Sequence, residues 1–553
     1  MYQQPKRKRA SSTPELERMA DGSVCLEIAK APAKSPHAED AQRRKAMERS
    51  VDSPCDFADR IGRQYASRKS DAERKANGVF FTPEPVARFM AGFVAGRKAS
   101  VRLLDPAAGV GMLICAAVEN LINTGAVTEI AVTAFEIDHD LVKGLKLVLE
   151  ELRSWAAEHD VSVEFTIKNE DFLLSESLLV DLLSATRAST KFDFVIANPP
   201  YFKIGKNDPR AAAASEVVYG QPNIYSLFMA VSANMLKAGG HFLFVVPRSF
   251  ASGPYFARFR RWLFERIRPT HIHVFDSRKD AFGRDEVLQE NVIFSGVHDD
   301  SWRQKTEHVS MCISSCHGLA DLADAREVKK PLSEMIAGAD TILRIPGSSE
   351  EEEALARVER WHGSLEKYGL KISTGPVVAF RATRWLRKEA GDTVPLIWLN
   401  HVFPMELHWP NGVRKPQYIE RAASEGKLLV PNKNYVLLRR FSAKEDARRL
   451  TAAPLLASHI DADAVGLENH LNYIYRPGRT MSADEVWGLT ALYSSSLLDN
   501  YFRCVNGNTQ VSATELRTMP LPPLEKIIEL GKRVQRQREG LIRIDATVEE
   551  VIG

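Results

Sequence analysis

The sequence predicts an α/β protein in two parts: a mostly parallel sheet with helices on both faces, followed by a C-terminal α+β domain. Two observations carry this prediction. Between residues 100 and 300, short apolar runs alternate with segments of helical period, a pattern typical of a parallel sheet. The chain also has 553 residues, whereas one hydrophobic core usually stops growing at about 250 to 300 residues. We therefore expect more than one folded domain.

The expected elements of the first part follow one another as strand and helix. Strands are expected at residues 101–104, 129–137, 161–168, 192–197, 241–246, 271–275 and 291–297. Helices are expected at residues 112–122, 139–158, 225–236 and 256–267. Each strand is short and rich in apolar residues, and the glycines at 239 and 240 are expected to end the helix before them.

Four segments are expected along the chain. Residues 1–70 are rich in charge and poor in large apolar side chains, which indicates a disordered or loosely ordered tail with a short helix near residues 40–49. A first domain over 71–300 is followed by a connector over 301–345, where the periodicity fades. The second domain, 346–553, has β-like stretches such as 375–380, 394–398 and 435–439, and a final helix from 524 to about 542.

Composition excludes several classes of protein. Hydrophobic residues make up 44% and charged residues 26% of the chain, close to globular averages, so a wholly disordered or collagen-like chain is excluded. No apolar run reaches the roughly 18 residues of a membrane span, and we expect a cytoplasmic protein without a membrane partner. Six scattered cysteines predict no disulfide framework, and their spacing predicts no metal site. A net charge of +3 does not by itself indicate a polyanionic partner.

The strongest chemical signal is the tetrad Asn198-Pro199-Pro200-Tyr201, directly after the expected strand 192–197. The two prolines lack backbone N–H groups and stiffen the chain. The groups left to form hydrogen bonds are therefore the carbonyl oxygens and the side chain of Asn198. The Asn198 and Pro199 oxygens can each accept one N–H from a planar exocyclic amine, while Tyr201 can stack on the attached ring. The alternative is a simple turn at the end of a strand.

A second group of residues predicts a nucleoside site. Asp105 and Gly109 lie between the first expected strand and its helix, where glycine lets the backbone approach a ligand. Glu136 ends the second strand, where a carboxylate can bind ribose hydroxyls, and Asp171-Phe172 after the third strand can hold an adenine. The third glycine of a pyrophosphate-binding turn is absent. A nucleoside without pyrophosphate fits best, and S-adenosylmethionine meets that description.

With these motifs, residues 78–300 resemble the amino-group DNA methyltransferases of the N6-adenine class, in the gamma-type order of cofactor motifs, NPPY tetrad and target-recognition domain. Residues 78–83 are similar to the N-terminal cofactor motif of that group. The resemblance implies a Rossmann-like S-adenosylmethionine-dependent methyltransferase sheet. It implies cofactor contacts from Phe81, Thr82, Asp105, Ala107, Gly109, Glu136, Ile137, Asp171 and Phe172. It also implies catalysis by Asn198, Pro199, Pro200 and Tyr201, with Tyr201 and Phe282 stacking on a flipped base.

Two stretches of the second part, 373–381 and 506–515, resemble modification enzymes of the BsuBI/PstI type of restriction-modification systems. The resemblance implies a target-recognition domain, double-stranded DNA as partner and a nucleoid-associated protein. A cognate restriction endonuclease would share the site without a stable complex. Arg381, Arg384 and Arg439 are expected to contact DNA, although each can equally be a solvated surface charge. Asn432, Asn434 or Gln510 can read adenine.

The implied reaction transfers the methyl group of S-adenosylmethionine to the N6 amine of an adenine flipped out of duplex DNA, leaves S-adenosylhomocysteine and needs no metal. Three other substrates remain open for an NPPY tetrad: cytosine N4, guanine in RNA, and protein glutamine. A non-catalytic DNA-binding module is a further alternative. The long segment 346–553 favours duplex DNA, because a peptide substrate requires far less protein.

Overall fold

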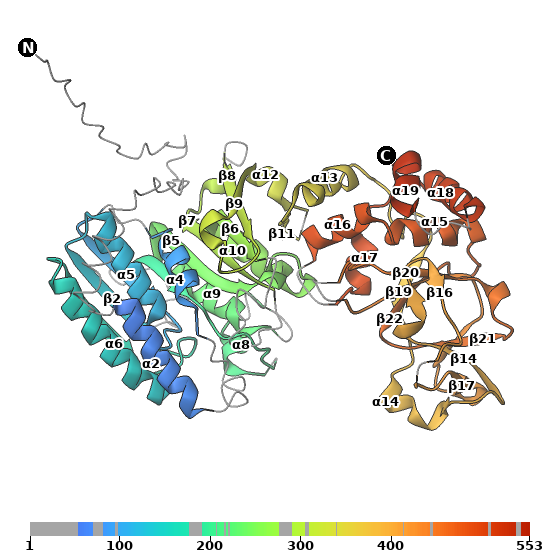
Figure 1. Cartoon of the computed structure of the whole chain (residues 1–553), viewed down its shortest axis with the longest axis horizontal. Coiled ribbons are helices and arrows are strands. Elements are labelled where there is room, and N and C mark those ends of the chain that lie inside the picture. Colours follow the sequence, from blue (N-terminus) through green and yellow to red (C-terminus); the bar gives the residue numbers. More distant parts are fainter. Residues whose placement is uncertain are drawn as a thin grey trace, which may run out of the picture. The chain divides into compact units, whose positions relative to one another are not determined.

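The computed structural model divides into two compact units. Unit 1 comprises Met1–Val246 and Arg261–Met335, and unit 2 comprises Pro247–Arg260 and Ile336–Gly553 (Figure 1). The structure describes residues 53–69, 81–94, 98–175, 191–205, 207–214, 217–218, 222–275, 290–304, 309–338, 340–412, 414–442, 446–506, 510–537 and 543–553.

Unit 1 is built on a mixed sheet, which within the described residues has nine strands in the order β3-β2-β1-β4-β5-β7-β6-β8-β9. The strands are β1 (Ser100–Asp105), β2 (Glu129–Phe135), β3 (Ser162–Lys168), β4 (Phe192–Ala197), β5 (Leu236–Pro247), β6 (Ile267–Phe275), β7 (Asn291–His298), β8 (Ser310–Cys316) and β9 (Arg326–Pro331). β1 pairs in parallel with both β2 and β4. The strand order therefore reverses at β1, and the carboxyl ends of strands beside such a reversal are where open α/β sheets bind ligands.

Helices cover both faces of this sheet, as a Rossmann-like methyltransferase fold requires. The helices in this part of the chain are α2 (Pro54–Arg68), α4 (Glu84–Ala91), α5 (Met112–Thr124), α6 (His139–Ala157), α8 (Pro209–Ala213), α9 (Ile224–Asn234), α10 (Ala257–Arg266), whose first residues belong to unit 2, and α12 (Leu332–Met335). Figure 1 shows α2, α4, α5 and α6 together, and these helices share one core with Leu243 and Ile293 of the sheet. Successive strand residues face opposite sides. Phe294 accordingly packs on the other face, against Phe264 of α10.

The last part of the segment expected to be a disordered tail, residues 1–70, is helical in the structure, because α2 lies within it. Ser53 caps this helix and forms a capping box with Asp56. Cys55 and Ala58 are buried in the core of unit 1, and the Cys55 N–H donates to Glu119 at 2.9 Å. Charged residues cover the rest of the helix, which hid its short apolar face from the sequence pattern. The helix expected near 40–49 lies outside the described residues.

The expected connector over 301–345 is wrong, because β8 and β9 extend the sheet there. β8 pairs in parallel with β6, and β9 pairs antiparallel with β8. β8 consists largely of Ser and Cys, with Met311 and Ile313 as its large apolar residues, and β9 is an edge strand with Arg, Glu and Lys, which suits an edge. β5 also begins at Leu236, before the two glycines that were expected to end the preceding helix.

Unit 2 is an α+β unit with two main sheets, in the orders β12-β22-β19-β20 and β13-β17-β14-β21-β18. Its strands are β10 (Ile336–Ala337), β11 (Ile342–Leu343), β12 (Lys371–Thr374), β13 (Leu386–Arg387), β14 (Thr393–Ile397), β15 (Val402–Phe403), β16 (Glu406–Leu407), β17 (Tyr418–Glu420), β18 (Leu429–Pro431), β19 (Tyr435–Arg439), β20 (Ala452–Leu455), β21 (Ala464–Leu467) and β22 (Leu471–Tyr475). Its helices are α13 (Ser349–Val358), α14 (Ala379–Ala382), α15 (Ala483–Tyr493), α16 (Ser496–Val505), α17 (Ala513–Thr518), α18 (Leu524–Arg536) and α19 (Ile544–Ile552).

The helices α15 and α18 of unit 2 cross at very short range. A Cβ atom on Gly488 would lie 1.9 Å from the carbonyl oxygen of Ile527, and one on Gly531 would lie 1.9 Å from that of Asp484. Only glycine allows this approach. The final helix expected from residue 524 is thus a packing element, whereas the β-like stretch expected at 375–380 is a turn that leads into α14.

Candidate active site

Asp105 and Asn198, a predicted cofactor residue and a predicted catalytic residue, stand at the ends of two neighbouring strands of unit 1. Asp105 ends β1, and Asn198 comes directly after β4. The two strands are parallel and in register, with Leu104 opposite Val195. The carboxyl ends of both strands therefore lie at one edge of the sheet, beside the reversal of strand order.

Contacts with two side chains fix the amide of Asn198. Its Nδ2 donates to Oγ1 of Thr82 at 3.0 Å, just before α4. Its Oδ1 lies 2.5 Å from the hydroxyl of Tyr201, which also lies 2.8 Å from the carbonyl oxygen of Val245 in β5. A carbonyl oxygen can accept two hydrogen bonds. The contact with Tyr201 therefore does not by itself exclude a second donor at Oδ1.

Tyr201 forms part of the wall of the site. The residue is 9% exposed, and its ring meets that of Tyr225 edge-on at 6.1 Å. Burial raises the pKa of its hydroxyl well above the usual value, so the hydroxyl stays protonated and can donate. The next residue, Phe202, is more exposed, at 36%. Phe282, the other residue expected to stack on a base, lies outside the described residues.

A glycine turn connects β1 to α5. Gly109 and Gly111 have positive φ angles of 54° and 91°, which favour glycine. A Cβ on Gly111 would come within 2.9 Å of Leu145, so this glycine also allows α6 to pack closely. The N–H of Ala107 donates to Oδ1 of Asp105 at 3.0 Å. The turn thus curls back over the end of its own strand.

Asp105 is a fully buried carboxyl group at this turn. Among the described residues, its Oδ2 has no hydrogen-bond partner. Burial, together with a smaller contribution from the nearby carboxylate of Glu136, raises the pKa of Asp105 to about 8, although the hydrogen bond from Ala107 opposes the shift. An unpartnered buried oxygen is unfavourable. A cationic or N–H-bearing ligand group at Oδ2 would relieve this.

Glu136 and Ile137 stand at the end of β2, next to the glycine turn. Glu136 accepts hydrogen bonds from the backbone N–H groups of Gly109 at 2.9 Å and Asp138 at 2.8 Å. Burial raises the pKa of Glu136, and the backbone donors partly oppose this. Ile137 is 67% exposed, which is unusual for a large apolar side chain beside polar groups. A carboxylate and an exposed apolar side chain in sequence can bind the sugar and the base of a nucleoside.

Asp171 and Phe172 follow β3 and lie in different environments. Phe172 is buried and stacks on Phe228 of α9 at 5.3 Å. Asp171 accepts from the N–H of Leu173 at 2.8 Å, and its Oδ2 lies 3.6 Å from a guanidinium nitrogen of Arg210 in α8. Sequence reasoning missed Arg210. The only local signal was the helix start at Asp208, which says nothing about contact with residue 171.

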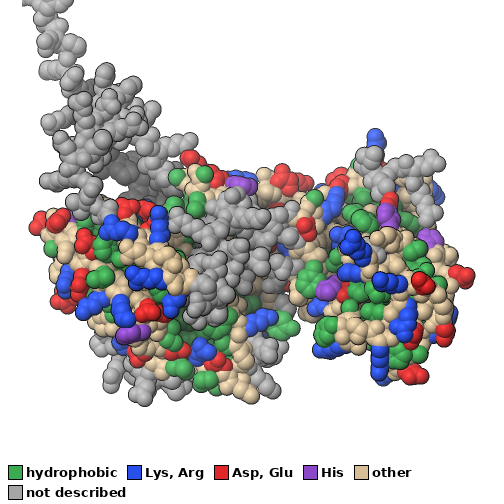
Figure 2. Space-filling model, turned by 60° about the horizontal axis from the view of Figure 1, so that its bottom comes forward, with side chains coloured by type: hydrophobic (Ala, Val, Ile, Leu, Met, Phe, Trp, Pro, Cys, Tyr) green, Lys and Arg blue, Asp and Glu red, His purple; other side chains and the backbone are tan. Residues whose placement is uncertain are grey.

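The residues expected to contact DNA lie in unit 2 and differ in accessibility. Arg381 and Arg384 are exposed. Arg439 is partly buried, and its Nε donates to the carbonyl oxygen of Val402 at 2.7 Å. Figure 2 shows Lys and Arg side chains among hydrophobic ones on one face of unit 2. Arg381 and Arg384 are thus better placed than Arg439 to reach a polyanion.

Asn432 and Asn434, expected as adenine readers, hold the backbone of unit 2 instead. Nδ2 of Asn432 lies within 3.0 Å of the carbonyl oxygens of Ala457, Ile460 and Ala462. Nδ2 of Asn434 donates to the carbonyl oxygen of Met481 at 2.7 Å. These side-chain donors are already used within the protein, so the structure does not support direct reading of adenine.

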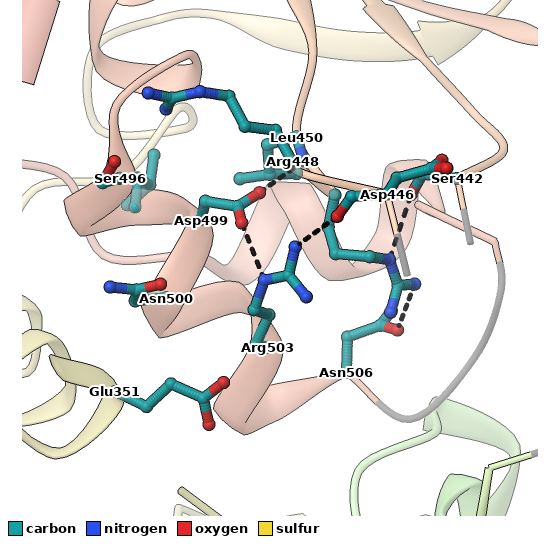
Figure 3. Close-up of polar contacts among 12 residues, drawn as sticks. Glu351, Ser442, Asp446, Arg448, Leu450, Ser496, Asp499, Asn500, Arg503 and Asn506 are labelled. Atoms are coloured by element: carbon teal, nitrogen blue, oxygen red, sulfur yellow. Dashed lines mark hydrogen bonds and ion pairs between the residues drawn. The ribbon is translucent and has the colours of Figure 1, made fainter. Parts of the chain in front are cut away.

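Unit 2 also contains a polar cavity of about 580 Å³. Figure 3 shows Arg503 turned toward Asp499 and Asp446. Its Nε lies 2.8 Å from Asp499 Oδ2, and a terminal nitrogen lies 2.9 Å from the Asp446 carbonyl oxygen. Asp499 also accepts from the N–H of Leu450 at 2.7 Å, and Arg448 pairs with Asp545 at 3.0 Å. These contacts tie α16 and α19 to the segment before β20, so we interpret the cavity as structural. No described helix combines the length and apolarity that crossing a membrane requires.

Comparison with known proteins identifies the family. Residues 119–282 match the model of the Eco57I restriction-modification methylase family. The chain is 34% identical over 484 residues to the type II methyltransferase M.BsuBI of Bacillus subtilis, which covers 86% of this chain and 94% of that protein. It is 32% identical over 498 residues to the type II methyltransferase M.PstI of Providencia stuartii, with coverage of 89% and 96%. Among solved structures, the ATP-dependent type ISP restriction-modification enzyme LlaBIII bound to DNA is similar in fold, with a TM-score of 0.50 and 11% identity over 88% of this chain and 42% of that one. From the identity and coverage of the two curated relatives, the chain belongs to the type II DNA methyltransferases of restriction-modification systems.

Proposed function

We propose that this DNA methyltransferase uses S-adenosylmethionine to methylate the N6 amine of an adenine flipped out of duplex DNA, as the modification enzyme of a type II restriction-modification system. The observation that carries the proposal is the amide of Asn198, which Thr82 orients at the same sheet edge as the buried carboxyl group of Asp105, whose Oδ2 has no partner among the described residues. A cognate endonuclease would read the same site without forming a stable complex.

The residues around the glycine turn fit S-adenosylmethionine. Asp105 offers a buried oxygen without a described partner to the cationic end of the molecule, and Glu136 offers a carboxylate to the ribose hydroxyls. Ile137 exposes an apolar surface to the adenine, and Asp171 can accept from its amine. Thr82, whose hydroxyl accepts from Asn198, is proposed to contact the methionine part of the cofactor. When bound, the cofactor supplies a methyl group on a sulfonium, which is an electrophile.

The tetrad prepares the substrate amine. Asn198 Oδ1 and the carbonyl oxygen of Pro199 each accept one N–H of the exocyclic NH₂, which holds both protons and directs the nitrogen lone pair toward the methyl group. Positioning supplies most of the acceleration, because the two reactants are held in line. The nitrogen becomes positively charged as its bond to the methyl carbon forms, and Asn198 stabilises that charge until the nitrogen loses one proton to solvent. Tyr201 is proposed to border the base, with its hydroxyl held by Val245.

Adenine is proposed over cytosine because the motifs and their order in the sequence resemble those of the N6-adenine class. Cytosine N4 remains the second candidate, since its exocyclic amine satisfies the same two acceptors. Identification of the methylated nucleoside distinguishes adenine from cytosine, because the geometry of Asn198 suits the exocyclic amine of either base.

The proposal is tested with tritium-labelled S-adenosylmethionine and duplex DNA. Purified wild-type protein should incorporate label into DNA, unlabelled S-adenosylhomocysteine should compete, and sequencing of the methylated DNA should map one short site. The Asn198→Ala variant should bind the cofactor normally by calorimetry yet incorporate little label. Cofactor binding without label in DNA from the wild-type protein would contradict the proposal.

A further inference from the structure

The short helix α14 is a fixed turn on the surface of unit 2. Val377, just before the helix, and Ala382, its last residue, are buried with Trp398 in one apolar cluster. The N–H of Val377 donates to the carbonyl oxygen of Leu467 at 3.0 Å, and the N–H of Asn469 donates to that of Val377 at 2.9 Å. The backbone of the turn is therefore held by core packing and by hydrogen bonds to the end of β21.

Phe380 projects from this fixed turn into solvent. It is 75% exposed, the highest value among the large apolar side chains that the structure describes. A single exposed apolar side chain is common on soluble proteins. The exposure of Phe380 therefore does not by itself indicate a binding site, and the groups around the ring decide its interpretation.

These surroundings are cationic. The guanidinium carbon of Arg381 lies 5.3 Å from the centre of the Phe380 ring, and that of Arg384 lies 4.5 Å from the centre of the Trp385 ring. Both arginines are exposed, and neither forms an ion pair with a described carboxylate within 4.0 Å. Lys388 is exposed close by in the sequence. Phe380 thus lies beside Arg381, and Arg384 follows in the same short segment; no carboxylate among the described residues pairs with either arginine.

Duplex DNA is the partner that fits this surface. Guanidinium groups bind phosphates, and apolar side chains that protrude from DNA-binding proteins insert between base pairs and partly unstack them. A stable protein interface needs about 800 Å² from each partner. One ring on a one-turn helix offers far less apolar surface.

We propose that Phe380 is a wedge that inserts at one base step of the bound duplex, while Arg381 and Arg384 contact the flanking phosphates. The inference rests on the proposed function and deepens it, because it assigns an unstacking role to unit 2 that is separate from base capture at Asn198. The wedge adds binding energy at a base step that deforms easily, so it also contributes to the choice of site.

Binding to a duplex that carries the mapped methylation site tests the wedge. Phe380→Ala should raise Kd about 5- to 150-fold, the range expected for loss of one base–aromatic stack. Phe380→Trp keeps an aromatic ring and should restore most of the affinity. The slope of log affinity against log salt should not change in Phe380→Ala, because no charge is lost, whereas Arg381→Ala should make it shallower by about 0.9. The matched control is Leu147→Ala, which removes an exposed apolar side chain from α6 in unit 1 and should leave Kd unchanged.

Fluorescence of 2-aminopurine, placed at one position of the duplex after another, locates the unstacked step. Wild-type protein should raise the fluorescence at one step besides the target base, and Phe380→Ala should abolish that signal while the signal at the target base remains. A Kd for Phe380→Ala within twofold of wild type would overturn the inference, as would a second signal that persists in this variant. In either case, methyl transfer by the wild-type protein would leave the proposed function standing. Absence of that transfer would overturn both.

Discussion

Replacing Asn198 by alanine is the most informative perturbation of the proposed site. The change removes one of two acceptors aimed at the nitrogen on which charge develops. Loss of one comparable preorganised hydrogen-bonding group lowers kcat about 10²- to 10³-fold, or about 2.7–4 kcal/mol. The contact of Asn198 with Thr82 is also lost, at about 1 kcal/mol of unfolding free energy. Tyr201 retains the carbonyl oxygen of Val245 as a partner, so the variant should stay folded.

The assay is single-turnover methylation with saturating cofactor and DNA, together with urea unfolding and calorimetry of cofactor binding. Tyr201→Phe is the matched control: it keeps the ring and removes only the hydroxyl that contacts Asn198. A neutral hydrogen bond contributes about 0.5–1.5 kcal/mol, so this control should lose roughly tenfold or less. A folded Asn198→Ala variant whose rate is within tenfold of wild type would refute the role of the Asn198 oxygen.

Three further predictions concern the groups around the cofactor site and unit 2. Burial holds the pKa of Asp105 at about 8, above its unfolded value of 3.8, so between about pH 4 and 8 the folded protein binds a proton that the unfolded protein does not. The free energy of unfolding should therefore fall as pH rises through this range. In urea unfolding, Asp105→Asn should flatten this pH dependence, and the variant should also bind the cofactor more weakly. Cofactor affinity of the wild type should rise over the same window, because a cationic ligand favours the ionised carboxylate, and calorimetry in two buffers should detect the released proton; an unchanged proton count would contradict this. Glu136→Gln leaves one carbonyl oxygen for two backbone donors, including Gly109, and should lower the unfolding free energy by about 1–3 kcal/mol. In the Arg381→Ala/Arg384→Ala double variant, the slope of log affinity against log salt should become shallower by about 1.8, measured by fluorescence anisotropy, and an unchanged slope would remove both arginines from the DNA interface.

The order and type of the elements in unit 1 follow from the sequence because its central strands are buried and apolar. β4 coincides with the expected strand at 192–197, and β1, β2 and β3 differ from the expected bounds by two residues at most. Strands that depend on tertiary context escaped prediction. β8 consists largely of Ser and Cys, and β9 is a charged edge strand, so neither carries the apolar signal on which the prediction relied.

The residues of the candidate site could be predicted from the sequence, but most contacts between their side chains could not. The tetrad and the glycine turn can be recognised in the sequence, because proline and glycine affect the backbone locally. The contact between Asn198 and Thr82, the approach of Arg210 to Asp171, and the position of the Tyr201 hydroxyl join segments far apart in the sequence. Local patterns do not determine such contacts.

The most direct test of the account identifies the methylated nucleoside. DNA incubated with the wild-type protein and S-adenosylmethionine carrying a deuterated methyl group is digested to nucleosides and analysed by mass spectrometry. The account predicts N6-methyldeoxyadenosine that contains the deuterated methyl group, and almost none with Asn198→Ala. Labelled N4-methyldeoxycytidine would contradict the adenine assignment, and the same yield of labelled adenine from both proteins would contradict the role of Asn198.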